Sequence, residues 1–158
     1  MNAAEFHLLL NHLPVLIPIL GFVILAAGLG LKSKDIQKTG LCVLVAAGLF
    51  ALPTYFTGEP AEDLVKNYPG VSRVAIHEHE EAGLWALVVL GLAAVVAAVA
   101  FGLMWKKKSV PRAAWGLLLL LSALACLAMA RTAHFGGLIR HEEIQTPQER
   151  ERFDAGQS

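Results

Sequence analysis

Four long apolar stretches without a charged side chain dominate this sequence. They occupy residues 8–31, 39–57, 82–105 and 113–130. A helix needs about 20 mostly apolar residues to cross the hydrocarbon core of a bilayer, and within lipid it satisfies its own backbone hydrogen bonds. Each stretch is close to that length. The sequence therefore predicts an all-α membrane protein, a four-transmembrane-helix bundle in which consecutive helices form two hairpins.

Composition supports a membrane protein and argues against a nucleic-acid partner. The chain is 56% hydrophobic and only 16% charged, whereas soluble domains are about 45–50% apolar and about 25% charged. Its formal net charge is zero, so it has no basic excess with which to bind nucleic acid. The expected primary partner is the lipid bilayer.

The basic residues give the predicted orientation. Lysine and arginine gather in the short segments 32–38 and 106–112, between the two members of each hairpin. Cytoplasmic loops are enriched in these residues, so we expect both segments in the cytoplasm, with an N-out, C-out topology. The predicted location is the bacterial inner membrane, with multiple passes. Residues 1–144 form the transmembrane domain, and 145–158 a polar C-terminal tail on the outer side, mobile or held by a partner.

Helix ends and helix contacts are suggested by small and cap-forming residues. Ser72 is a plausible N-cap for the third long helix, Gly58 and Pro60 should end the second, and Gly136-Gly137 should end the fourth. The third helix carries a stripe of small residues that permits close helix packing in lipid. The stripe consists of Gly91, Ala94, Ala98 and Gly102.

Cys42 and Cys126 should differ too much in depth within the membrane to form a disulfide.

All six histidines are expected at the outer ends of the helices. Ionisable side chains at membrane depth are commonly functional, and imidazole is a ligand for haem iron, zinc, copper and nickel. No two histidines stand four apart within one helix, so a site would have to be assembled between helices. The layer comprises His7, His12, His77, His79, His134 and His141, together with Tyr55, Glu59, Glu78, Glu80, Glu81, Glu142 and Glu143.

Four of these histidines are candidate cofactor ligands. His12 and His79 are the first-choice axial pair for a haem iron, because both lie near the outer entry of helices that run in the same direction. His134 or His141 could replace one of them. Each also has a structural alternative: a hydrogen bond to a neighbouring helix for His12, a carboxylate contact for His79, a helix end for His134 and a surface position for His141. His7 and His77 are predicted to be solvated.

The sequence resembles a family of uncharacterised bacterial four-helix membrane proteins, a domain of unknown function, over residues 5 to 144. The resemblance implies that His12, His79 and His141 belong to the shared pattern of this family, and that His7 and His77 lie outside it. The matching motifs are Asn11-His12-Leu13-Pro14, Thr57-Gly58-Glu59-Pro60-Ala61-Glu62, His79-Glu80 and Gly136-Gly137-x-Ile139-Arg140-His141.

Three functions fit these observations. The first is a membrane electron-transfer subunit, a b-type cytochrome whose haem b lies near the periplasmic face, exchanging electrons between quinone and a periplasmic redox partner. The second is a non-catalytic structural or anchoring subunit of a larger membrane complex. The third is a metal-binding protein with a His/Glu site on the outer face. No Ser-His-Asp candidate, nucleotide loop or reactive cysteine environment indicates catalysis by this chain alone, although it could be a subunit of a membrane oxidoreductase complex.

Overall fold

The computed structural model describes residues 1–141 and 144–155, and in these ranges the only regular secondary structure is helical. Four long helical segments are apolar enough to cross a membrane: 3–30, 34–65, 73–105 and 112–138. The predicted all-α architecture with four candidate transmembrane segments is thus confirmed. The helices are α1 (Ala3–Leu10), α2 (Leu13–Gly30), α3 (Lys34–Phe56), α4 (Gly58–Val65), α5 (Arg73–Trp105), α6 (Arg112–Leu138) and α7 (Pro147–Ala155).

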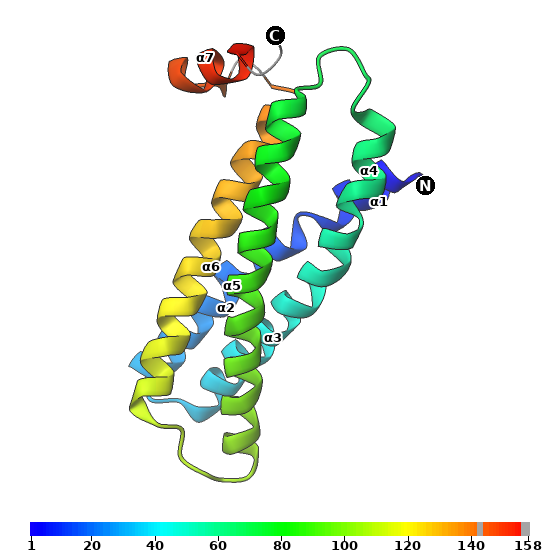
Figure 1. Cartoon of the computed structure of the whole chain (residues 1–158). Helices are drawn as coiled ribbons and strands as arrows, with labels where there is room; N and C mark the ends of the chain where they lie inside the picture. Colours follow the sequence, from blue (N-terminus) through cyan, green and yellow to red (C-terminus); the bar gives the residue numbers. More distant parts are fainter. Residues whose placement is uncertain (142–143, 156–158) are drawn as a thin grey trace.

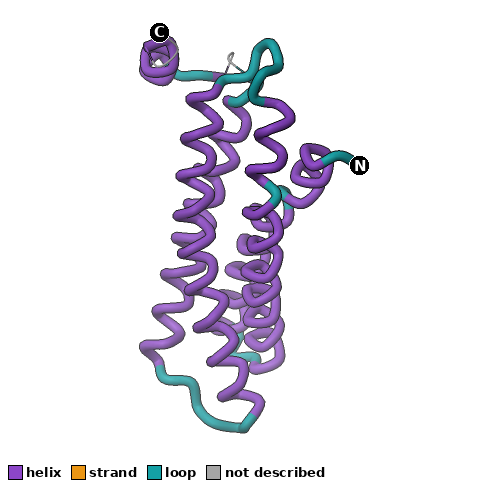
Figure 2. The backbone as a smooth tube through the Cα atoms, turned by 45° about the vertical axis from the view of Figure 1, so that its right-hand side comes forward, coloured by secondary structure: helices purple, strands orange, loops and turns teal. Residues whose placement is uncertain are grey.

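The four long helices form a closed antiparallel ring. Helix α2 packs on α3, α3 on α5, α5 on α6, and α6 back on α2. Both lysine-rich turns lie at one end of the bundle, and α1 and α7 lie toward the other (Figure 1). Figure 2 shows the long helices running side by side, with α1 turned away from them near the N-terminus. The core is built from leucine and alanine, among them the fully buried Leu25, Leu44, Leu90, Ala97 and Leu118.

The first predicted helix is broken into two helices near the histidine-bearing end. Helix α1 ends at Leu10, and α2 begins at Leu13 with Pro14 in its first turn. Proline has no N–H with which to bind the carbonyl four residues earlier, and its ring crowds that carbonyl. The carbonyl of Leu10 instead accepts a hydrogen bond from Thr54 Oγ1 at 3.4 Å. This break lets α1 turn out of the bundle and lie against α4.

Two predicted helix ends lie within two residues of the observed ends at Phe56 and Leu138. The glycines and the proline that were expected to end these helices nevertheless lie inside helices. The chain bends at Thr57 and continues as α4, with Pro60 in the first turn, where an N–H is not needed. Helix α6 runs through Gly136-Gly137 to Leu138. Gly136 faces the His79 ring, where a Cβ would lie only 3.1 Å from the nearest ring atoms. Close packing therefore explains why a glycine stands within this helix.

Other sequence-based expectations hold. Ser72 caps α5 and accepts a hydrogen bond from the Ala75 N–H at 3.2 Å. The Ser72 N–H donates to the Ile139 carbonyl at 3.0 Å, and Arg140 donates to the Pro69 carbonyl at 3.3 Å. These two hydrogen bonds join the segment before α5 to the turn after α6. Cys42 and Cys126 are both free.

The small-residue stripe on α5 is only partly a packing surface. A Cβ at Gly48 of α3 would meet the Cβ of Ala94 at 2.5 Å, whereas Cβ atoms at Gly91 and Gly102 would meet nothing within 4 Å. Ala98 is exposed. The closest backbone approaches are instead between α2 and α3, at Gly28 and Gly40.

The polar tail folds back onto its own chain. Phe153 of α7 is 2% exposed and packs with Ala75, Ala82, Phe135 and Leu138 at the ends of α5 and α6. His134 Nε2 donates to Glu149 Oε1 at 2.9 Å. Helix α7 thus lies across the end of the bundle (Figure 1).

We expect acid to loosen α7. Hydrogen bonds from His134 and then from Thr146 lower the pKa of Glu149 from 4.5 to about 2. A carboxylate with a lowered pKa stabilises the folded state above its ordinary pKa, and that contribution is lost as the pH falls from about 4.5 through about 2. A spin label on Gln148→Cys, with Cys42 and Cys126 replaced, should become mobile over this range.

Two variants provide the control for this titration. His134→Ala removes the partner on α6 and keeps the Thr146 cap, so its label should already be mobile at pH 7. Glu149→Gln should be mobile at pH 7 and change little between pH 5 and pH 2. A wild-type label with constant mobility across that range would contradict the assigned contact.

Candidate histidine site

The structure brings together two histidines from different helices, His7 of α1 and His79 of α5. Their ring centroids are 6.4 Å apart, and their ring planes are nearly perpendicular, at 88°. Both side chains are partly buried. The pair lies where α1, the α3–α4 bend, α5 and α6 meet.

The His79 ring is held by α6. Its Nδ1 lies 2.8 Å from the Thr132 carbonyl oxygen. A carbonyl can only accept, so Nδ1 carries the hydrogen, and in the neutral ring Nε2 keeps a free lone pair. Gly136 leaves the space in which the ring lies. This arrangement orients His79 as many metal-binding histidines are oriented, with the second nitrogen fixed by a carbonyl.

The His7 ring is held by the bend between α3 and α4. Its Nδ1 lies 3.0 Å from Thr57 Oγ1. The Thr57 hydroxyl donates its own hydrogen to the Thr54 carbonyl at 2.8 Å. The hydroxyl oxygen therefore accepts from His7 Nδ1–H, and Nε2 of the neutral ring again keeps its lone pair. Two imidazoles with available Nε2 atoms thus lie side by side.

His12, which the sequence favoured as the partner of His79, does not lie beside it. The ring beside His79 is that of His7. His12 stands at the break between α1 and α2, is exposed, and donates from Nδ1 to the Leu8 carbonyl at 3.0 Å within its own segment. His7 occupies the place beside His79 because Pro14 ends the helix early and allows α1 to turn. The sequence shows this proline, but not the direction in which α1 would turn.

The other candidate ligands lie apart from the pair. His134 uses Nε2 to bind Glu149, and its ring lies against Phe135. His141 follows α6 and is exposed, as is His77.

The other members of the predicted layer are acidic residues and a tyrosine. Glu78 is buried, while Glu59, Glu80 and Glu81 are exposed. Glu142 and Glu143 lie outside the described residues. Tyr55 packs edge-on against Phe56.

The chemistry of the assembled site is that of two imidazoles. Within residues 1–141 and 144–155, no three His, Cys, Asp or Glu side chains converge in a way that could hold a metal ion. A pair of neutral imidazoles suits the two axial positions of a haem iron or a soft ion of low coordination number. His7, Thr57, Thr132 and Gly136 are the members that sequence reasoning missed. Thr57 and Gly136 stand in the motifs that carry the family resemblance, but those motifs do not indicate which histidine each residue contacts.

Gly136→Ala should disturb the His79 ring. The new Cβ would lie 3.1 Å from two ring atoms, and overpacking of this kind costs about 1–3 kcal/mol. Gly116→Ala in the same helix is the matched control, because a Cβ there meets nothing within 4 Å and alanine favours helix by up to about 1 kcal/mol. Thermal unfolding in detergent should separate the two variants, with only Gly136→Ala lowering the midpoint. Equal midpoints would contradict the close contact.

Comparison with known proteins gives no relative: the sequence matches no family model, no curated protein and no solved structure.

Proposed function

We propose that this chain is a multi-pass protein of the bacterial inner membrane that serves as an electron-transfer subunit, a b-type cytochrome with one haem b near the periplasmic face. The observation that carries the proposal is the His7–His79 pair. In this proposal His79 and His7 would hold the haem iron, and His7 is favoured over His12 because its ring lies beside that of His79.

The pairing of the two rings supports this proposal. Their centroids lie 6.4 Å apart, with the ring planes at 88°. Each ring would offer its Nε2 to the iron, because its Nδ1 is already used in a hydrogen bond.

The protein groups around the pair have roles that follow from their hydrogen bonds. Thr132 and Thr57 hold the Nδ1 atoms and so fix the rings and their tautomers. Two neutral imidazoles add no charge to a site of low dielectric, where charge is costly. A bound haem would supply reversible one-electron chemistry. An outer position suits exchange with a periplasmic partner, while quinone reaches the bundle from the membrane.

The orientation in this proposal follows from the lysine-rich turns and can be tested by labelling. In a background without Cys42 and Cys126, a membrane-impermeant maleimide should label Lys66→Cys on intact cells. It should label Lys107→Cys only after permeabilisation. The opposite pattern would contradict the proposed periplasmic position of the histidine pair.

The function itself is tested on the purified wild-type protein from haem-sufficient cells. Pyridine haemochrome and metal analysis should give one haem b per chain, with iron as the only stoichiometric transition metal. Absence of both haem and metal would reject electron transfer and leave the structural subunit as the better account.

A bare metal ion at the same pair is a second candidate. Imidazole nitrogen is a ligand for zinc and copper as well as for haem iron, so the pair itself would also suit such an ion. Stoichiometric zinc or copper without haem would select this candidate.

A further inference from the structure

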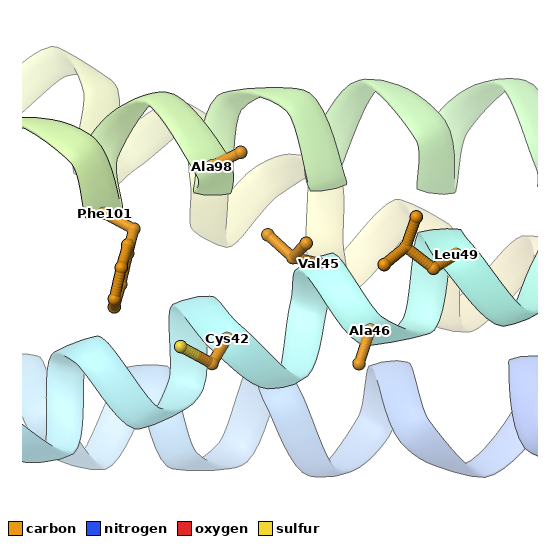
Figure 3. A pocket seen from close by; sticks show the side chains of 6 residues that line it. All are labelled: Cys42, Val45, Ala46, Leu49, Ala98 and Phe101. Atoms are coloured by element: carbon orange, nitrogen blue, oxygen red, sulfur yellow. The ribbon is translucent and has the colours of Figure 1, made fainter.

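An apolar groove runs along the outside of the bundle between α3 and α5. Its volume is about 310 Å³, and its lining residues are Cys42, Val45, Ala46, Leu49, Ala98 and Phe101. Figure 3 shows that the Phe101 ring extends from α5 toward Cys42, and that Leu49 lies farther along α3. Two of the lining residues, Ala46 and Ala98, have small side chains. From Cys42 to Leu49 it extends along α3 for about 10 Å.

The groove lies within two of the candidate membrane spans, 34–65 and 73–105. Cys42, Leu49 and Ala98 are exposed, so the open side of the groove faces outward from the bundle. A membrane would bring acyl chains to this surface. The lining offers no hydrogen-bonding side chain other than the weak thiol of Cys42, so its occupant there must be a hydrocarbon chain.

Basic residues stand at one end of the groove. Lys38 precedes Cys42 by one helical turn, and Lys106 follows Phe101 and Trp105 on α5. Lys38 lies 3.6 Å from Asp35, whose side chain is 95% exposed. Trp105 is 74% exposed, and its ring centre lies 6.0 Å from that of Phe101. Along the two helices, Lys38 and Lys106 therefore stand about one helical turn beyond the apolar lining, Lys106 as the C-cap that follows Trp105.

We infer that this groove binds an anionic phospholipid, with one acyl chain between α3 and α5 and the phosphate at Lys38 and Lys106. Charge complementarity favours this occupant over a second copy of the chain. Two copies facing each other in parallel through this groove would bring their lysine-rich ends together, and like charges would repel. The inference does not depend on the proposed haem.

The test uses vesicles of phosphatidylcholine with one-fifth phosphatidylglycerol, followed by native mass spectrometry of the released protein. The wild type should retain one phosphatidylglycerol per chain in preference to phosphatidylcholine. Lys38→Gln and Lys106→Gln should each lower that preference about fivefold, since a basic residue near an anionic surface contributes about 1 kcal/mol. Lys66→Gln, at the other end of the bundle, is the matched charge control and should not change it.

A second pair of variants tests the acyl chain's position. Ala98→Leu fills the groove and should abolish lipid retention. Val99→Leu adds bulk at the next position, which is 60% exposed and outside the lining, and should retain the lipid. Equal retention of both lipids by the wild type, or equal behaviour of these two variants, would overturn the inference. Disulfide cross-linking through Cys42 between two copies in the vesicles would overturn it too.

Discussion

Gly28→Ala and Gly40→Ala should each destabilise the protein by at least about 2 kcal/mol. A Cβ at Gly40 would lie 2.7 Å from the backbone nitrogen of Leu25, and a Cβ at Gly28 would lie 2.7 Å from that of Gln37. Backbone atoms cannot move aside as a side chain does, so α2 and α3 would have to separate. Close backbone approach at small residues is a principal source of helix association in lipid, where burial of apolar surface contributes little.

Thermal unfolding in detergent measures this effect, and the midpoint should fall by roughly 5–10 °C for each substitution. Gly30→Ala is the matched control: it lies in α2, and its Cβ would meet nothing within 4 Å. Alanine at that position should leave the midpoint unchanged or raise it slightly. If Gly40→Ala unfolded at the same temperature as Gly30→Ala, the close α2–α3 contact would be wrong.

Hydropathy predicted the number and approximate extent of the long helices, because about 20 apolar residues in a row have few alternatives to a membrane span. The helix ends were less predictable. Pro14 and Pro60 both lie in the first turn of a new helix, α2 and α4, and the preceding helix ends a few residues before each of them. Gly136 is kept inside α6 by the ring of a distant residue. These outcomes depend on tertiary contacts, which a local pattern does not contain.

The sequence predicted that histidines would gather in one layer at the outer ends of the helices. It did not predict which two of them would lie side by side. The chain order places histidines near the ends of several helices. The structural alternative for His79 was a carboxylate contact, whereas its Nδ1 donates to the Thr132 carbonyl of α6. His7 was expected to be solvated, yet it packs against His79 and Thr57. Its position follows from the turn of α1, and no spacing in the sequence specifies that turn. The tail was expected to be mobile or held by a partner, and Phe153 instead docks it on α5 and α6.

We expect His79→Ala and His7→Ala to lose haem almost completely in the purified protein. Each removes an axial ligand in the proposed site, and the remaining imidazole cannot hold the iron from both sides. Thr57→Val should have a smaller effect, lowering cofactor affinity about 10–100-fold, because it removes the oxygen that orients His7 but keeps the ring. His77→Ala is the matched control on α5, two residues from His79 and exposed, and should bind haem like the wild type.

The reduced-minus-oxidised visible spectrum of the purified protein tests the central claim most directly, recorded for the wild type, His7→Ala, His79→Ala and His12→Ala. The proposed pair predicts the spectrum of a six-coordinate b-type haem in the wild type and in His12→Ala, and its loss in the other two variants. A spectrum lost in His12→Ala and kept in His7→Ala would assign the second ligand to His12. A wild type without a haem spectrum, despite haem-sufficient growth, would contradict the b-type cytochrome altogether.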